Sequence, residues 1–460
     1  MSKAPPLFDH QVQSVEFLEL NPRVLDMSDP GTGKTRTQIE AFSRHRANGG
    51  GKALVIAPKS LLKSAWAEDV AKFAPELKVS VAVVPKRDQA FAEDADIYIT
   101  NTDATTYLAG KKPSFFADFD TLIVDESSFF KHGSSQRSKA LAKIRKFFKF
   151  RRLLTGTPNT NSITDLWHQI LVLDDGKRLG TSFFGFRAAV CEPKQVGPAA
   201  NMIQWSDREG AELSVAALLQ DITIRHKFEE CVSIPENHEY PVTFEMSPKQ
   251  KRVYDSLEKA TLAMTRDGGI ISAINAASLT TKLLQVASGA SYSGVEGKES
   301  DVINVCTSRY ELVADLVVQR KHSLVFFHWG HQRDAIKAEF DKRGIIYAVI
   351  DGSVSSSERE SIVSRYQAGM LNCILAHPQS AAHGLTLTKG TTTIWASPTY
   401  NLEHFMQGNK RLYRAGQTQK TETIVVVAKG TIEEKVMEKL LNKSKKQHSM
   451  LDLMQEYFNG

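Results

Sequence analysis

Ser28-Asp29-Pro30-Gly31-Thr32-Gly33-Lys34-Thr35, near the start of a 460-residue chain, is a glycine-rich turn between a short apolar run and a helical pattern. In that context backbone N–H groups and a helix N-terminus surround phosphate oxygens. The strict pattern has glycine five residues before Gly33, where this chain has Ser28. The turn predicts a phosphate-binding loop, with Lys34 on the β- and γ-phosphates and the Thr35 hydroxyl on Mg²⁺. Gly-Lys-Thr alone is also compatible with an ordinary turn.

Short apolar runs alternate with helical patterns on both sides of this turn. Between them, Ser60–Phe73 places apolar residues at helical spacing. Strand–helix alternation of this kind indicates a parallel sheet covered by helices. The strands expected in this first half are Arg23–Met27, Ala53–Ala57, Val79–Val84, Ile97–Thr100, Thr121–Val124 and Arg152–Leu154.

A second alternating series begins near Ser323, after a stretch, residues 160–305, that is mostly helical in pattern. Two prolines flank a polar run at Pro235–Pro241, which predicts a hinge. The expected strands are Ser323–Phe327, Ile345–Ile350, Cys373–Ala376, Thr392–Ala396 and Thr423–Val427, and the expected helices are Gln332–Arg343 and Ser356–Gln367.

The fold class is therefore α/β, with two doubly wound parallel-sheet domains and helical insertions between them. We expect an N-terminal domain with a helical extension at residues 1–235. We expect a C-terminal domain at residues 236–460, with a helical insertion and a basic C-terminal helix that runs through Ile432–Leu441 to Lys443, Lys445 and Lys446.

Two acids end an apolar strand at Leu122–Glu126. Asp125 is placed to hold Mg²⁺ through water, and Glu126 to orient and deprotonate an attacking water. Solvated acids that cap a strand are the alternative, but a phosphate loop about ninety residues upstream favours hydrolysis. The hydroxyl-rich turn in Leu153–Pro158 is compatible with a sensor of the γ-phosphate and with a simple strand-ending turn.

Two arginines in Gln407–Gln417, Arg411 and Arg414, lie three residues apart, so on a helix they share one face. The guanidinium fork suits a pair of phosphate oxygens, and an arginine finger reaches the γ-phosphate from the side opposite the phosphate loop. A solvated basic helix has the same pattern. With the N-terminal loop, the segment indicates that one end of the chain binds ATP and the other completes the site.

The composition narrows the class of protein. A net charge of +6 and a pI near 8.9 are compatible with a polyanionic partner but do not require one. No apolar run approaches the ~20 residues of a membrane span, and the start lacks a secretory signal. Four scattered cysteines without a Cys-x-x-Cys pair favour reduced thiols over a disulfide framework or a zinc site.

Two further patterns have ordinary explanations that we prefer. Lys143–Arg152 interleaves basic and aromatic residues, as single-strand binders do, but a helix end entering a core strand explains it. His328–His331 lacks a third metal ligand at suitable spacing, so we expect a strand-to-helix turn there. His377 and His383 are expected in loops.

Taken together, the motifs resemble the ATPase core of the Swi/Snf-type members of helicase superfamily two, and the resemblance covers nearly the whole chain. Phe8–Gln11 resembles the glutamine motif that reads adenine. Asp125–Ser128 resembles the Asp-Glu-x-His box with serine in place of histidine, and Thr386 replaces the usual asparagine of motif V. The other matching segments are Ala57–Leu62 with Trp66 and Glu68 (motif Ia), Leu154–Asn161 with Leu166 and Trp167 (motif III), Thr223–Lys227 before Ile234 and Pro235, Leu324–Phe327 (motif IV), Gly384–Leu387 (motif V) and Gln407–Gln417 (motif VI).

The resemblance implies two RecA-like lobes that hydrolyse ATP with Mg²⁺ and move along double-stranded DNA, without sequence preference. The implied catalytic residues are Lys34, Asp125, Glu126, Arg411 and Arg414. The implied nucleotide ligands are Gln11, Asp29, Gly31, Thr32, Gly33, Lys34, Thr35 and Gln407, and the metal ligands are Thr35 and Asp125. The implied DNA-contacting residues are Lys59, Ser60, Asn101, Thr102, Arg359 and Thr386.

Two other functions stay open. One is a helicase that separates strands of DNA or RNA, because the superfamily shares the core motifs. The other is a nucleotide-gated DNA-binding scaffold with little turnover. We expect a monomer without a membrane partner, open to a recruiting protein. The short chain suggests a bacterial or viral source and therefore the cytoplasm, at a bacterial nucleoid or in a virus-infected host cell.

Overall fold

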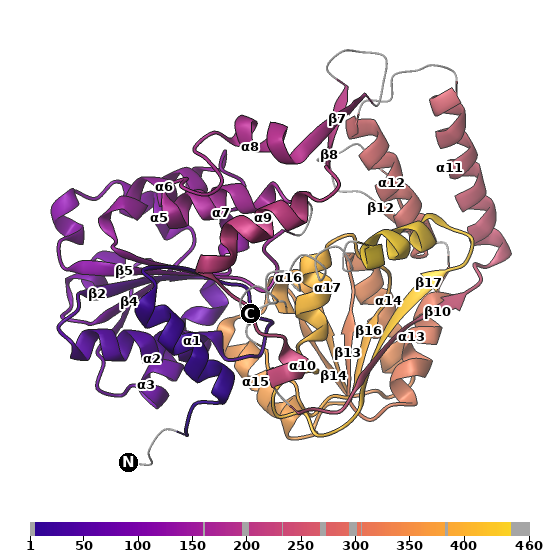
Figure 1. Ribbon diagram of the computed structural model, residues 1–460. Helices are drawn as coiled ribbons and strands as arrows, with labels where there is room; N and C mark the ends of the chain where they lie inside the picture. Colours follow the sequence, from indigo (N-terminus) through magenta and orange to yellow (C-terminus); the bar gives the residue numbers. More distant parts are fainter. Residues whose placement is uncertain are drawn as a thin grey trace. The chain divides into compact units, whose positions relative to one another are not determined.

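The computed structural model describes residues 5–159, 162–195, 202–231, 233–266, 273–293, 301–304, 306–381 and 385–442. The chain divides into two compact units, a first unit that ends at Ser233 and a second unit that begins at Ile234. Each unit is built on one parallel sheet with helices on both faces (Figure 1). The α/β class expected from the alternating patterns is confirmed.

The sheet of the first unit has seven parallel strands in the order β3-β4-β2-β5-β6-β1-β9. All six expected strands are present, and Thr223–Ile224 (β9) adds an edge that the sequence analysis did not anticipate. The other strands are β1 (Arg23–Asp26), β2 (Lys52–Ala57), β3 (Val79–Val81), β4 (Ile97–Asn101), β5 (Phe119–Asp125) and β6 (Phe150–Leu154).

Helices cover both faces of this sheet because successive strand residues point to opposite faces. Leu54 packs with α5, α6 and α7 on one face, and its neighbour Val55 packs with α2 and α3 on the other (Figure 1). The helices are α1 (Asp9–Leu20), α2 (Lys34–Ala47), α3 (Glu68–Phe73), α4 (Arg87–Ala92), α5 (Ala104–Ala109), α6 (Gln136–Ile144), α7 (Asp165–Asp174), α8 (Phe183–Val190), α9 (Ala211–Leu219) and α10 (Phe228–Cys231).

Two local expectations in the first unit were tested. The helix expected at Ser60–Phe73 is divided into a 3₁₀ turn (Lys59–Leu61), a π-helix (Leu62–Ala67) and α3. The core explanation of Lys143–Arg152 is confirmed, because Phe148 is buried in the core and the Arg151 guanidinium donates to the carbonyl oxygens of Val172 and Leu173.

The sheet of the second unit has six parallel strands in the order β10-β17-β16-β13-β15-β14. Helices α13 and α14 pack on one face, and α15 and α17 on the other. The strands are β10 (Asn237–Phe244), β13 (Ser323–Phe326), β14 (Tyr347–Ile350), β15 (Cys373–Ala376), β16 (Thr392–Trp395) and β17 (Thr421–Ala428). The helices are α11 (Pro248–Arg266), α12 (Ala273–Ala287), α13 (Ser308–Val318), α14 (Gly330–Lys342), α15 (Ser356–Gln367), α16 (Pro378–Ala381), α17 (Leu402–Asn409) and a last helix at residues 432–442.

The boundary between the two units falls directly before the hinge expected at Pro235–Pro241, and that hinge stays a prediction for the residues before Asn237. Most of that run belongs to β10, which pairs in register with β17 from Asn237 to Phe244. Because β10 is an edge strand, one side of Pro241 needs no ladder hydrogen bond, and proline is tolerated there.

The stretch 160–305 is also less helical than expected. It contains the hairpins β7 (Cys191–Gln195) with β8 (Ile203–Asp207) and β11 (Ala290–Ser293) with β12 (Asp301–Asn304). The expected turn at His328 is confirmed between β13 and α14. Residues His383, Lys443, Lys445 and Lys446 lie outside the described part. Within the described ranges, no helix is both long enough and apolar enough to span a membrane.

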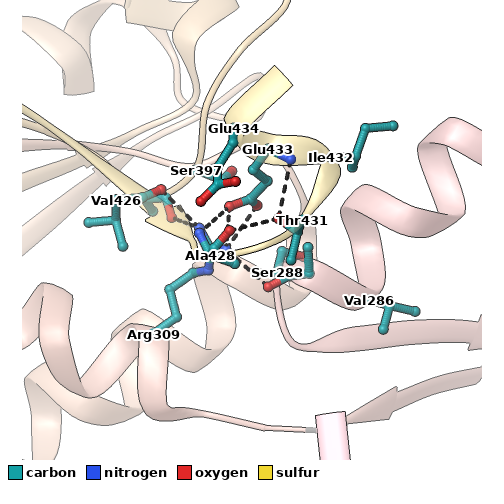
Figure 2. Close-up of polar contacts among 12 residues, drawn as sticks. Val286, Ser288, Arg309, Ser397, Val426, Ala428, Thr431, Ile432, Glu433 and Glu434 are labelled. Carbon is teal, nitrogen blue, oxygen red and sulfur yellow. Dashed lines mark hydrogen bonds and ion pairs between the residues drawn. The ribbon is translucent and has the colours of Figure 1, made fainter. Parts of the chain in front are cut away.

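A buried ion pair joins the last helix to the sheet of the second unit (Figure 2). The Arg309 guanidinium lies 2.7 Å from the Glu433 carboxylate and also donates to the carbonyl oxygens of Ala396, Val426 and Ala287. The backbone N–H of Ala428 donates to Glu433. These contacts compensate the burial of both charges, which are at most 1% exposed, and tie α12, α13, β16, β17 and the last helix together.

Candidate active site

The glycine-rich turn connects β1 to α2, as the sequence predicts. Gly31 and Gly33 have φ of +94° and +86°, which L side chains rarely adopt, and a Cβ on Gly33 would lie 2.3 Å from Gln11 Nε2. The Lys34 ammonium donates to the carbonyl oxygens of Ser28 at 2.6 Å and Asp29 at 3.2 Å. The lysine is therefore held against its own loop.

The loop is braced by the segment that follows β9. The Arg225 guanidinium, 1% exposed, lies 2.7 Å from Asp29 Oδ1, and the N–H of Phe228 donates to Asp29 Oδ2. The N–H of His226 donates to the Ser28 hydroxyl at 3.1 Å. Serine in place of glycine at position 28 thus supplies an acceptor for the brace. The sequence analysis gave Arg225 no role; its one signal is a basic residue directly after the β-branched pair Thr223–Ile224.

Gln11 lies at the start of α1 and reaches the same loop. Its Nε2 donates to the Thr32 carbonyl at 3.3 Å, and its Oε1 accepts the N–H of Phe8. His10 Nε2 lies 2.8 Å from the same Thr32 oxygen, a contact that the sequence analysis missed. The expected glutamine motif and the phosphate loop are therefore brought together.

The acid pair stands at the carboxyl end of β5, close to the loop. Asp125 and Asp26 both pair with Leu154, so the ends of β5, β6 and β1 are neighbours. Trp66 Nε1, on the π-helix, donates to Asp125 Oδ2 at 2.9 Å. Burial raises the pKa of Asp125, while the Trp66 hydrogen bond and the Lys34 charge oppose that rise. Glu126 follows with φ of +53°, a left-handed conformation unusual for a non-glycine residue.

A glutamine links the acids to the hydroxyl-rich turn. Gln169 on α7 accepts the Ser127 hydroxyl at 2.7 Å and donates to the Pro158 carbonyl at 2.9 Å. The N–H of Thr155 donates to the Asp26 carbonyl, so the turn also contacts β1. The Thr157 hydroxyl is buried and has no hydrogen-bond partner among the described residues. The turn therefore has an unused donor beside the loop, since its Gly156 packs against Pro30.

The residues expected to contact DNA in the first unit share one edge of the sheet. Lys59 and Ser60 follow β2 after Pro58, and Asn101 ends β4 opposite Ala57. Lys59 is exposed, whereas Thr102 is only 7% exposed. Arg87, not singled out from the sequence, donates to Asn101 Oδ1 at 2.9 Å.

The two arginines of the second unit do not lie on a helix, and that expectation is wrong. Helix α17, which carries Gln407, ends at Asn409, and the turns that follow carry Arg411 and Arg414. Both guanidinium groups nevertheless donate to the same carbonyl oxygen, that of Leu385, at 3.4 and 2.9 Å. A tertiary contact thus brings them together where helical periodicity does not.

Two further residues of the second unit are expected to contact DNA, and they lie on different elements. Thr386 is exposed beside the buried Leu385, and Arg359 is half-buried on α15. The described residues exclude Gly384 of the expected motif V and Thr160 and Asn161 of the expected motif III.

The donor set of the first unit fits Mg²⁺ bound with a nucleotide. Asp125 and Thr35 offer a carboxylate and a hydroxyl oxygen, the hard donors that Mg²⁺ prefers beside substrate phosphates and waters. A Cβ at Gly31 or Gly33 would press on Phe228 or Gln11, so the loop backbone needs glycine there, and the Thr157 hydroxyl is free to donate.

Two family models match the chain. Residues 308–416 match the helicase conserved C-terminal domain, and residues 12–288 match the SNF2-related domain. The second match alone covers more than half of the chain. This protein belongs to the SNF2-related family. The Swi/Snf resemblance is confirmed, and the SNF2-related protein is an ATPase of helicase superfamily two.

Relatives of this SNF2-related protein differ in length. It is 27% identical over 444 residues to putative protein p41 of Acyrthosiphon pisum secondary endosymbiont phage 1, covering 92% of this chain and 93% of that protein. It is 26% identical to the Xenopus tropicalis SWI/SNF-related matrix-associated actin-dependent regulator of chromatin subfamily A-like protein 1, covering 90% of this chain but 41% of that protein. The putative ATP-dependent helicase/translocase YwqA of Bacillus subtilis is 24% identical, and the match covers 89% of this chain and 44% of that protein.

A solved structure is similar over most of the chain. The Sulfolobus solfataricus SWI2/SNF2 ATPase core in complex with dsDNA is 22% identical, with a TM-score of 0.46, and the match covers 98% of this chain and 95% of that one.

Proposed function

We propose that this SNF2-related ATPase hydrolyses Mg-ATP between two motor lobes, residues 1–235 and 236–460, and moves along double-stranded DNA without separating the strands. The observation that supports it best is the register of β1, β6 and β5, because Asp26 and Asp125 flank Leu154. That register puts the phosphate loop and the acid pair at one edge of one sheet.

The first lobe binds the nucleotide and activates water. The backbone of Gly31–Gly33 and the Lys34 ammonium bind the β- and γ-phosphates, with Gln11 on the adenine. Thr35 and Asp125 hold Mg²⁺, which offsets negative charge on the phosphates when bound. Glu126 accepts a proton from water as the oxygen attacks the γ-phosphorus, and the bond to the β-phosphate oxygen breaks, leaving ADP and phosphate.

The second lobe completes the reaction. Arg411 and Arg414 offer positive charge to the γ-phosphate oxygens from the side opposite the loop, with Gln407 nearby in the chain. Hydrolysis therefore requires the lobes to close, and release of products lets them open. The DNA backbone contacts that this cycle moves are made by Lys59, Ser60, Asn101, Thr102, Arg359 and Thr386.

The Bacillus subtilis relative is described as a putative helicase/translocase and a Schizosaccharomyces pombe relative as a chromatin remodeling factor, which supports a DNA motor. We place the motor in the cytoplasm as a monomer that a protein partner recruits to DNA. Contacts to the backbone phosphates make its binding independent of sequence and sensitive to salt.

Steady-state ATP hydrolysis tests this proposal, measured without nucleic acid and with duplex DNA, single-stranded DNA, forked DNA and RNA. We expect strong stimulation by duplex that is lost in Glu126→Gln and kept in Glu16→Gln, a matched change at an exposed acid on α1. Duplex should also support displacement of a triplex-forming oligonucleotide. Stimulation only by single strands or RNA indicates a strand-separating helicase, and no turnover indicates a nucleotide-gated scaffold.

A further inference from the structure

The second unit has a pocket of about 720 Å³ at the amino-terminal edge of its sheet. Thr392 and Thr421, the first residues of β16 and β17, line it, and so does Gln319–His322, which leads directly into β13. The strands here are parallel, so this edge is the one opposite their carboxyl ends. The shorter strands have four residues, which separates the two edges by about 13 Å.

The pocket carries an excess of positive charge. Lys321, Lys389 and Lys420 line it with exposed side chains, and none forms an ion pair with any residue in the described ranges. Its acid, Glu422, is already paired with Arg320 and also accepts the Thr392 hydroxyl at 2.9 Å. Three positive charges therefore face the pocket without compensation.

The uncharged lining favours phosphate groups over an acidic protein segment. Thr391 and Gln419 add a hydroxyl and an amide, side chains that contact nucleic-acid phosphates together with lysine. No aliphatic side chain is present among the described residues that line the pocket. Protein interfaces rely on apolar and aromatic anchors and are depleted in lysine, so a peptide would find little to bury here.

The loops that carry two of the lysines are fixed to each other. Gln417, 3% exposed, donates from Nε2 to the carbonyl oxygens of Thr388 and Gly390, on either side of Lys389. Its Oε1 accepts the N–H groups of Thr418 and Gln419, next to Lys420. The lysine backbones are therefore held in place before any ligand binds.

We propose that this pocket binds backbone phosphates of nucleic acid, as a second contact remote from the carboxyl edge of the sheet. The phosphate chemistry rests on the lining itself, while the choice of nucleic acid rests on the proposed function. A nucleic-acid strand that reached both edges of the sheet would contact the second unit over a greater length than one bound only by the expected motif residues.

Salt-dependent binding of a fluorescent duplex to the full chain tests this. The triple variant Lys321→Gln, Lys389→Gln, Lys420→Gln should reduce the slope of log affinity against log salt by about 3 and weaken binding at least about tenfold near 0.1 M salt. The matched control removes three exposed lysines elsewhere in the unit, Lys249→Gln, Lys251→Gln and Lys435→Gln, and should keep the wild-type slope. A variant in which arginine replaces all three pocket lysines keeps the three charges and should bind the duplex as the wild type does.

The outcomes separate this inference from the proposed function. Equal slopes and affinities in the pocket variant, the control and the wild type would overturn the inference, even if duplex stimulates ATP hydrolysis. A lowered slope without any DNA-stimulated hydrolysis would support the pocket and contradict the motor. Unchanged DNA binding with loss of binding to a poly-glutamate peptide would overturn the choice of nucleic acid.

Discussion

In the first unit, the expected catalytic side chains follow strands; in the second unit, they follow a helix. Lys34 comes after β1 and Asp125 ends β5, and each is held by a contact inside the unit, Lys34 by its own loop and Asp125 by Trp66. Arg411 and Arg414 come after α17 and share the Leu385 carbonyl. Strand ends place the first set through the sheet, whereas carbonyl oxygens of Leu385 and Gln407 help to place the second. Nucleotide binding and catalysis should therefore be separable by mutation.

The largest expected effect is on turnover. Arg414→Ala should reduce kcat by about 10³-fold or more, because an arginine finger acts on charge that develops in the transition state. ATP binding should change little, whereas Lys34→Ala should weaken binding and turnover together. Arg252→Ala, an exposed arginine on α11, is the control. Rapid-quench kinetics and fluorescent-nucleotide binding measure both, and turnover within tenfold of wild type in Arg414→Ala would remove the finger role.

The next effect compares ion pairs of the two units. Glu433→Gln leaves the Arg309 charge unpaired in the core, so we expect a loss of about 3–5 kcal/mol in the unfolding free energy of the second unit. Glu40→Gln breaks a partly exposed pair with Arg44 on α2 and should cost under about 1 kcal/mol. Urea unfolding, with hydrogen exchange read over β16–β17 and over β5–β6, measures each unit. Similar losses of unfolding free energy in the two variants would contradict the larger contribution that we assign to the buried pair.

Buried histidines should make the stability of both units depend on pH. Burial lowers the pKa of His168 in the first unit and of His331 in the second to about 4, from 6.5 when unfolded. Between these values the unfolded state binds more protons, so stability is lost as pH falls from 6.5 towards 4. Each histidine should cost about 2 kcal/mol at pH 5.

Hydrogen exchange at pH 7 and pH 5 measures this loss in each unit separately. His331→Gln should reduce the pH dependence over β13–β15 without abolishing it, because burial also lowers the pKa of His328 to about 4. It should leave the pH dependence over β5–β6 unchanged. An unaltered pH dependence in the second unit would show that other groups control it.

The smallest effect concerns how the first unit holds its acid. Trp66→Phe keeps the ring but removes the N–H that donates to Asp125, so about tenfold more Mg²⁺ should be needed for half-maximal hydrolysis. Trp167→Phe is the matched control, since its Nε1 donates to the Gly180 carbonyl. Magnesium titrations of ATPase activity measure both variants. An equal shift in the two would assign the effect to packing.

Much of the fold was predictable because burial on both faces leaves continuous apolar runs. The strands that line the two sheet centres, such as Thr121–Val124 and Cys373–Ala376, were all expected and are all present. Two edge strands were missed because they lack such an apolar run. β9 is only Thr223–Ile224, and β10 is mostly exposed and contains Pro241, so neither has the apolar signature of a buried strand.

The candidate site was predictable where chemistry is local. A phosphate loop needs consecutive residues, and the acid pair needs a strand end, so both could be recognised from Ser28–Thr35 and Leu122–Glu126. Contacts between distant residues left no such pattern. Gln169 lies 42 residues from Ser127, and its amide joins two motifs that the sequence shows only as separate segments.

By itself the amino-acid sequence determined the two-sheet α/β class, the family resemblance and the local motifs, because strand burial, glycine-rich turns and strand-end acids depend on neighbours in the chain. Only the tertiary structure decided that Arg225 braces Asp29, that Trp66 holds Asp125, that both arginines meet at Leu385, and that three lysines surround one pocket. The physical reason is that such contacts depend on where packing brings distant segments, and pairwise contacts of this kind impose no periodicity on the sequence.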